Sequence, residues 1–198
     1  MALASLEKYL VYKVPLKDVN TVNDNSRYIV RDISLDDIEN DEWLKADKKS
    51  LLKLIRSGHI GAVIFDKAKQ TVAARGFIAM NGKRPDHIPK VPKDVAWLHY
   101  AAVKEECRGQ GLQNYLTTFL IQNIRKIDNK MDIYIDTEED NVPSRINQKK
   151  LGLIEEGIYT VLKIGTQRIP FGCIQFGFWD KKREHPTLLL RYFNTKSY

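Results

Sequence analysis

A short segment in the middle of the chain combines an arginine with two closely spaced glycines. It runs Arg108-Gly109-Gln110-Gly111-Leu112-Gln113, after the apolar segment 95–103 and at the start of the amphipathic segment 111–127. Glycine lets a ligand approach the backbone, and the N–H groups that open a helix attract an anion. The segment therefore predicts a binding site for a diphosphate, with Arg108 as an additional cation at its mouth.

Two other phosphate-binding loops do not fit this segment. A P-loop requires Gly-Lys-Ser/Thr, and no such triplet follows Gly111. The dinucleotide-binding fingerprint requires a third glycine at the position that Asn114 occupies. The glycines therefore indicate a phosphate site of another kind.

A second motif follows the predicted strand 132–136. It opens with Asn141-Val142-Pro143-Ser144 and closes with Leu151-Gly152-Leu153. Asparagine is a preferred helix cap, proline fits the first helical turn, and glycine commonly follows the end of a helix. The motif predicts a short helix, and capping alone is enough to explain Asn141.

Together the two motifs resemble those of the GNAT superfamily of acyl-CoA N-acyltransferases. The first family motif, Arg/Gln-x-x-Gly-x-Gly/Ala, is matched from Arg108 to Gly111, whereas Gln113 replaces the usual glycine or alanine. The second, Asn-x-x-Ala/Ser followed by Gly-Phe, is matched at Asn141 and Ser144, with Leu153 in place of phenylalanine. The order and spacing of the motifs also fit, over residues 28–180.

The resemblance implies that acetyl-CoA is the co-substrate and assigns residues to it. The backbone at the end of the 95–103 strand would bind the pantetheine arm like an added strand, and the glycine loop would hold the diphosphate. Asn141 would reach the pantetheine near the sulfur, and Ser144 would lie along the same edge. The cofactor-binding residues implied are Ala101, Ala102, Val103, Arg108, Gly109, Gln110, Gly111, Leu112, Gln113, Asn141 and Ser144.

The resemblance also implies direct attack of an amine on the thioester, for which an ammonium group must first lose a proton. His99 is the candidate base or water-relay member, because an unperturbed imidazole titrates near pH 6.5. A structural histidine in an apolar strand is the alternative. The backbone N–H of Val103 is the expected oxyanion donor.

Gln148 stands at the position where the family usually has the tyrosine that protonates the leaving thiolate. Glutamine does not titrate, so either another tyrosine or water must supply this proton. The candidate tyrosines are Tyr115, Tyr134 and Tyr159. An N-acetyltransferase is the leading hypothesis, and a non-catalytic acyl-CoA-binding or regulatory module with the same fold is the alternative.

Two features bear on the acceptor amine. The acidic run 36–42 would attract a cationic amine, or else it is a solvated helix start that the helix dipole favours. Four aromatic residues would line an apolar acceptor pocket, or else belong to the core. They are Trp43, Phe171, Phe176 and Trp179.

Hydrophobic periodicity predicts a mixed α/β fold (α+β) in a single domain. The resemblance implies a GNAT-like fold, in which helices flank a central, mixed, mostly antiparallel sheet of about seven strands. We expect the domain at residues 27–180, an N-terminal extension at 1–26, and a C-terminal extension at 181–198. The early segment 3–12 is predicted as a short helix or a strand, and 185–193 as an extra strand or a homodimer contact. The predicted strands are 28–33, 60–65, 71–80, 95–103, 132–136, 153–164 and 173–179; the predicted helices are 35–45, 48–56, 111–127 and 141–152.

Composition limits the remaining possibilities. A chain of 198 residues that is 43% hydrophobic can form a core, which excludes disorder as its main state. Its apolar runs are too short to span a membrane, its start lacks a signal-peptide layout, and two cysteines are too few for a disulfide framework. We therefore expect a cytoplasmic protein without a membrane partner. The histidines and cysteines have no metal-ligand spacing, so no metal is expected.

The net charge of +7 permits an anionic partner. The positive charge is dispersed along the chain, and no RNA-binding motif, zinc-finger spacing or basic helix face accompanies it. We therefore expect acetyl-CoA, with Lys149 and Lys150 near its phosphates, and not a nucleic acid, as the anionic partner. The other partner is an amine, either a small molecule or a protein amine.

Overall fold

The structure is a computed structural model that describes residues 4–16, 26–85, 88, 92–164, 173–181 and 187–193; it describes the backbone alone for 4–5, 163–164 and the last two ranges. The strands are β1 (Ala4–Lys13), β2 (Tyr28–Asp32), β3 (Ile60–Asp66), β4 (Thr71–Ala79), β5 (Val95–Val103), β6 (Asp132–Glu138), β7 (Ile154–Ile164), β8 (Cys173–Lys181) and β9 (Thr187–Phe193). The helices are α1 (Leu35–Asn40), α2 (Glu42–Lys45), α3 (Lys48–Arg56), α4 (Leu112–Ile127) and α5 (Val142–Lys150), with a 3₁₀ turn at Glu105–Cys107.

The strands form one sheet in the order β2-β3-β4-β5-β6-β1-β7-β8-β9. Only β5 and β6 pair in parallel; every other neighbouring pair in the described sheet is antiparallel. The predicted fold class, a mixed and mostly antiparallel sheet flanked by helices, is confirmed. The sheet has nine strands instead of about seven, because the two segments of uncertain type, at the two ends of the chain, both form strands.

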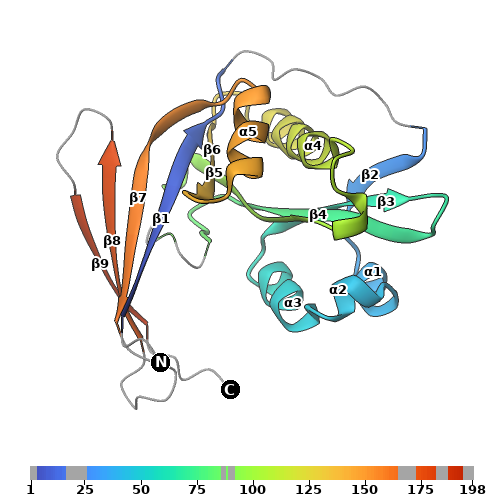
Figure 1. The fold of residues 1–198 in the computed structure, drawn as a ribbon, viewed down its shortest axis with the longest axis horizontal. Coiled ribbons are helices and arrows are strands. Elements are labelled where there is room, and N and C mark those ends of the chain that lie inside the picture. Colours follow the sequence, from blue (N-terminus) through green and yellow to red (C-terminus); the bar gives the residue numbers. More distant parts are fainter. Residues whose placement is uncertain are drawn as a thin grey trace.

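Residues 4–13 do not behave as part of an extension. They form β1, which lies inside the sheet between β6 and β7 and pairs with both (Figure 1). Tyr9, Val11 and Tyr12 are buried there. The prediction that residues 1–26 precede the domain is therefore corrected for this segment: its partners lie more than a hundred residues away, and local pattern does not show them.

The edge strand of the sheet next to β8 comes from the predicted C-terminal extension, residues 181–198. Residues 187–193 form β9, which pairs with β8 in antiparallel register from Cys173 opposite Phe193 to Trp179 opposite Thr187. Of the two interpretations of the segment 185–193, the extra strand is therefore present in the structure.

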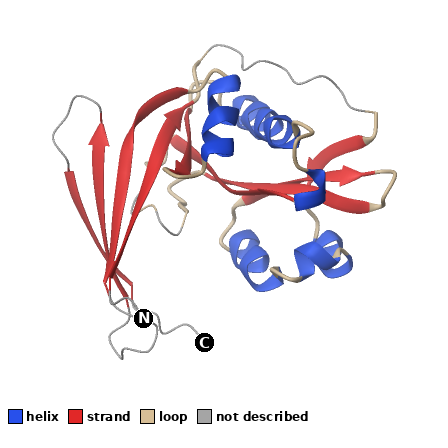
Figure 2. Cartoon of the chain, in the orientation of Figure 1, coloured by secondary structure: helices blue, strands red, loops and turns tan. Residues whose placement is uncertain are grey.

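The helices cover opposite faces of the sheet. Figure 2 shows α1–α3 on one side of strands β2–β4, and α4 on the other. Helix α4 packs its apolar stripe, including Leu116, Leu120 and Ile124, into the largest buried cluster. Helices α1–α3 enclose a separate cluster with Ile38, Leu44 and Phe77 of β4.

The helix predicted at 35–45 is interrupted at Asp41. Its backbone is extended (φ −93°, ψ 118°), and its side chain accepts hydrogen bonds from the N–H groups of Trp43 and Leu44 at the start of α2. The other carboxylate oxygen accepts from the hydroxyl of Thr71 and the N–H of Val72 on β4. These bonds favour a new helix start over continuation, so two short helices replace one.

Candidate functional site

A cavity of about 670 Å³ lies between the end of β5, the start of α4 and helix α5. It brings together two sequence motifs that are about thirty residues apart. All the expected CoA-binding residues except Gln110 line it. The lining consists of Ala101, Ala102, Val103, Cys107, Arg108, Gly109, Gly111, Leu112, Gln113, Asn114, Asn141, Pro143, Ser144, Asn147 and Lys150.

The two glycines expose backbone to this cavity. Gly109 and Gly111 have φ values of +78° and +74°, a left-handed conformation that glycine adopts without strain. A Cβ built at either position meets nothing within 4 Å. The backbone there is therefore open to the cavity, as a loop that binds an anion through its N–H groups requires.

The start of α4 adds an electrostatic reason for anion binding. Gly111 is the N-cap of this 16-residue helix, and no side chain caps it. The first N–H groups of a helix have no intrahelical acceptor, and the dipole places a partial positive charge there. Arg108 and Lys150 bring two cations to the wall of the same cavity. These features fit a phosphate-bearing ligand.

The side chain of Gln110 is engaged outside the cavity, and a contact of its backbone N–H with a diphosphate stays a prediction. Gln110 is exposed and absent from the cavity wall, and its side-chain Oε1 accepts a hydrogen bond of 2.6 Å from the hydroxyl of Tyr28 on β2. Tyr28 is only 3% exposed. Gln110 thus fastens the glycine loop to the edge of the sheet.

Helix α5 begins at the opposite wall. Asn141 is its N-cap and accepts a hydrogen bond from the Ser144 N–H at 3.2 Å, with Pro143 in the first turn, as predicted. Capping uses Oδ1 of Asn141, and the side-chain amide N–H groups remain as donors toward the cavity that Asn141 lines. Capping and ligand binding are therefore compatible at this residue.

The third wall is the end of β5, where the sheet opens. Pairing of β5 with β6 covers Val95–Leu98 and Asp132–Ile135 only. Ala101, Ala102 and Val103 come after this point, so their edge facing β6 has no partner among the described strands and lines the cavity instead. An extended ligand can hydrogen-bond such an edge in the manner of an added strand.

His99 does not line the cavity, although it precedes the lining residue Ala101 by two positions in β5. Neighbouring residues of a strand point to opposite faces of the sheet. Leu98 packs in the cluster with α4. The next residue, His99, therefore lies on the face of α1–α3, where it pairs with Phe77. His99 is 8% exposed, and its Nε2 lies 2.8 Å from Nδ1 of His59, just before β3. One of these nitrogens donates a hydrogen bond and the other accepts it, and the tautomers of the two rings decide which.

No family model matches this chain, and no curated protein matches its sequence. Its fold does match solved structures. One is a Drosophila protein, with 14% identity and a TM-score of 0.62 over 82% of this chain and 52% of its own. Another is a GNAT-family acetyltransferase from Colwellia psychrerythraea, with 15% identity and a TM-score of 0.56 over 84% and 58%. A tandem GNAT protein from the clavulanic acid biosynthesis pathway has 14% identity and a TM-score of 0.55 over 78% and 53%.

This chain has the GNAT fold. It spans little more than half the length of these three structures. At such low identity the likeness establishes the architecture, and the chemistry must be argued from the residues of the cavity.

Within the GNAT fold, Gln148 occupies an interior position. It is 1% exposed and does not line the cavity; its Nε2 lies 3.5 Å from the Ser144 hydroxyl, and its Oε1 has no hydrogen-bond partner. None of the candidate tyrosines lines the cavity either: Tyr134 stacks on Trp97, and Tyr159 is buried among β1 and β7 residues. Burial raises the pKa of Tyr159 well above its usual value, which opposes its use as a donor to a distant thiolate.

The acidic run is largely engaged in local structure. Asp37 forms a capping box with Ser34 and two hydrogen bonds of 2.6 Å with Arg31. Burial disfavours its charge, but these hydrogen bonds outweigh burial and lower the pKa of Asp37 to about 2. The helix-start interpretation therefore accounts for this run better than attraction of an amine does.

Of the four aromatic residues expected at an acceptor pocket, Trp43 stacks on Arg75 instead. The guanidinium carbon of Arg75 lies 4.9 Å from the centre of the Trp43 ring. Phe171 lies outside the described residues, and Phe176 and Trp179 belong to β8, of which the backbone alone is described. The prediction of an aromatic acceptor pocket stays a prediction.

Four lining residues were not expected from the sequence: Cys107, Asn114, Pro143 and Asn147. Asn114 and Asn147 follow Gly111 and Ser144 by three residues on their helices, and this helical spacing is the signal that points to the same face. Lys150 lines the cavity, whereas Lys149 is exposed outside it.

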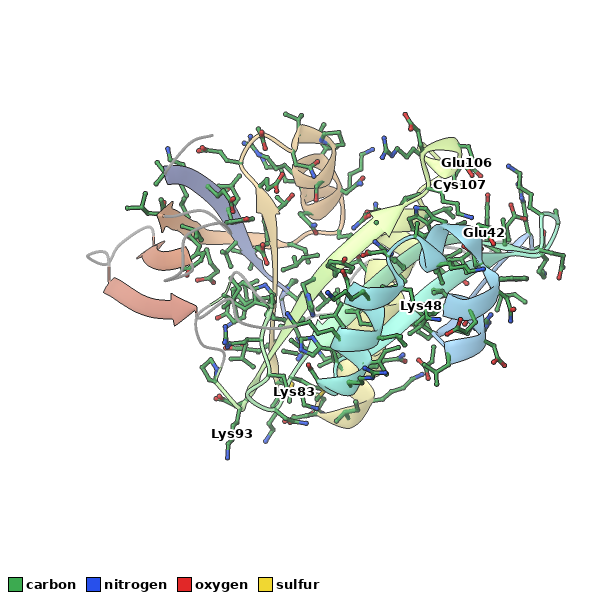
Figure 3. The ribbon with its side chains drawn as sticks, turned by 90° about the horizontal axis from the view of Figure 1, so that it is seen from below. Glu42, Lys48, Lys83, Lys93, Glu106 and Cys107 are labelled. Atoms are coloured by element: carbon green, nitrogen blue, oxygen red, sulfur yellow. The ribbon has the colours of Figure 1, made fainter. Side chains whose placement is uncertain are left out.

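Cys107 is the free thiol of the site. It is 2% exposed, and it ends the 3₁₀ turn that leads from β5 to the glycine loop. Figure 3 shows it next to Glu106, at the opposite end of β5 from Lys83 and Lys93.

Within the described residues, no group of three or more His, Cys, Asp or Glu side chains is arranged to hold a metal ion. None of the described helices is long and apolar enough to cross a membrane.

Proposed function

We propose that this chain is an acetyl-CoA-dependent N-acetyltransferase. The observation that carries the proposal is the single cavity that joins an unpaired strand edge, an open glycine loop at an uncapped helix start, and the N-terminus of a second helix. A ligand with a diphosphate at one end and an extended amide-containing arm at the other matches these three walls. The GNAT fold supports the same assignment.

In this proposal the loop from Arg108 to Gln113 binds the diphosphate through its N–H groups, with Arg108 and Lys150 as counter-charges. The pantetheine arm lies along Ala101–Val103 and pairs with the backbone. Asn141 donates a side-chain N–H to the arm near the sulfur, and Ser144 lies beside it.

The transfer itself requires a neutral amine and a donor to the thioester carbonyl. We assign the proton acceptor to His99, four residues before Val103. Because His99 does not line the cavity, the proton would reach it through water. The hydrogen bond between His59 and His99, at 2.8 Å, would help to disperse the positive charge that His99 acquires. The Val103 N–H would donate to the carbonyl oxygen, on which negative charge develops.

One observation favours the alternative, a non-catalytic acyl-CoA-binding module. Gln148 is buried away from the cavity, and none of the candidate tyrosines reaches the cavity wall. Protonation of the thiolate by water removes the difficulty, because a thiol with a pKa of about 8.5 leaves readily as a thiolate.

Calorimetry with acetyl-CoA, followed by detection of free CoA across an amine library, tests the proposal. We expect binding at micromolar concentrations and release of CoA with at least one class of amine. Binding without release from any amine supports the binding module. Absence of binding near millimolar acetyl-CoA overturns both.

A further inference from the structure

Tyr100, in the strand that borders the cavity, has a φ of +56°. Phe77 pairs with His99 and Arg75 with Ala102, so one residue of β4 faces two residues of β5, and β5 is bulged at Tyr100. A tyrosine in the left-handed region is strained, and it persists only where its surroundings hold it.

Side chains from two neighbouring elements hold Tyr100. Its hydroxyl donates to Oδ2 of Asp47, just before α3, at 2.6 Å, and Nη2 of Arg75 on β4 donates to the same oxygen at 2.7 Å. The guanidinium of Arg75 lies between two rings, 5.0 Å from the centre of Tyr100 and 4.9 Å from that of Trp43. We call Asp47, Arg75 and Tyr100 the Tyr100 clamp.

The clamp is partly buried: Tyr100 is 39% exposed, and the side chains of Asp47 and Arg75 are 29% and 11% exposed. Nε and Nη1 of Arg75 have no hydrogen-bond partner, and its ion pair is with Asp47. Burial disfavours the charge of Asp47, but hydrogen bonds from Tyr100 and Ser50 and the charge of Arg75 lower its pKa. A buried charge that loses its partner is destabilising, so Arg75, the most buried member, depends on its ion pair with Asp47.

The bulge immediately precedes the strand edge that lines the cavity. Ala101, Ala102 and Val103 come directly after Tyr100, are unpaired with β6 and form part of the cavity wall. The conformation of Tyr100 therefore sets the direction of the backbone groups of these residues. Without the clamp, β5 would be free to relax toward regular pairing with β4 and turn them away.

We propose that Asp47, Arg75 and Tyr100 are positioning residues that fix the β5 bulge, so that the backbone of Ala101–Val103 is preorganised to bind the pantetheine arm. This rests on the proposed function, because it takes an acyl-CoA as the ligand. It assigns to the start of α3, on the face of the sheet opposite α4, a part in binding the donor.

The test compares Tyr100→Phe with Tyr100→Gly. Phenylalanine keeps the ring over Arg75 and the strain at position 100, and loses the hydrogen bond to Asp47. Glycine loses the clamp as well, but it adopts a positive φ without strain. Each protein is titrated calorimetrically with acetyl-CoA and with 3′,5′-ADP, which has the adenosine and two phosphates but no pantetheine arm.

For Tyr100→Phe we expect acetyl-CoA to bind about tenfold more weakly and 3′,5′-ADP to bind as in the wild type, because a lost hydrogen bond to a charged group is of this order. For Tyr100→Gly we expect acetyl-CoA to bind only about threefold more weakly, because glycine keeps the bulge without strain. A general loss of structure would weaken both ligands alike, so the ratio of the two affinities separates positioning from stability.

Unchanged acetyl-CoA binding by Tyr100→Phe overturns the proposal, as does equal weakening of both ligands. Equally weak binding of acetyl-CoA by Tyr100→Gly and Tyr100→Phe also overturns the proposal, because the clamp would then not act through the conformation of residue 100. If the wild type binds neither ligand, the proposed function itself fails, and that result is distinct from the other three.

Discussion

Replacing Gly111 with alanine tests the loop with an internal control. Gly111 lines the cavity, has a φ of +74° and has space for a Cβ with no atom within 4 Å. Gly152, just after α5, has a φ of +75° and equally open surroundings, but it does not line the cavity. Gly152→Ala therefore introduces the same backbone strain as Gly111→Ala, but at a position outside the cavity.

The two effects can be estimated separately. A left-handed alanine costs about 1 kcal/mol relative to glycine, so each variant should lose about this much free energy of unfolding. Because Gly111 lines the cavity, we expect the added methyl group also to obstruct the approach of a phosphate to the backbone. Loss of one charge-assisted hydrogen bond is about 2 kcal/mol, or about thirtyfold in the dissociation constant.

Chemical denaturation and calorimetry with acetyl-CoA measure the two quantities. We expect equal destabilisation of the two variants, with weaker binding by Gly111→Ala only. If Gly111→Ala binds acetyl-CoA as tightly as Gly152→Ala does, that result refutes the assignment of the phosphate site to the open backbone of the glycine loop.

Three further variants test other parts of the structure. His99→Gln should lower kcat about a hundredfold with any amine that is acetylated and leave the Kd for acetyl-CoA unchanged; a fall in binding alone would contradict its role as base. Asp37, with its pKa lowered to about 2 from 3.8, contributes stability that is present above about pH 4 and lost as the pH falls through 2. Because the ion pair of Asp37 with Arg31 is partly exposed, the wild type should lose about 1 kcal/mol of unfolding free energy over this pH range. Denaturation should show this loss in the wild type and not in Asp37→Asn. Leu116→Ala removes a fully buried side chain that lies against Gly76, and should lower the unfolding free energy by about 3 kcal/mol; a loss under 1 kcal/mol would mean that α4 is not packed as described.

The parts of the site that the sequence predicts are those encoded within a few residues. Gly109 and Gly111 open the start of α4, and Asn141 caps α5; both follow from local backbone preferences. Local pattern does not predict the break at Asp41, because the break depends on Thr71 and Val72, thirty residues further along the chain. Likewise, the position of Gln110 outside the cavity depends on Tyr28.

The amino-acid sequence by itself determined the order of the helices and the middle strands, and the two motifs that line the cavity. Periodicity and capping are local, so each segment carries this information alone. Tertiary structure decided which strands are neighbours: β1 between β6 and β7, β5 separating from β6 beyond Leu98, and Tyr100 held in a strained bulge by Asp47 and Arg75. It also brought His59 to His99 across forty residues. These arrangements follow from packing and hydrogen bonding between distant segments, which no local pattern encodes.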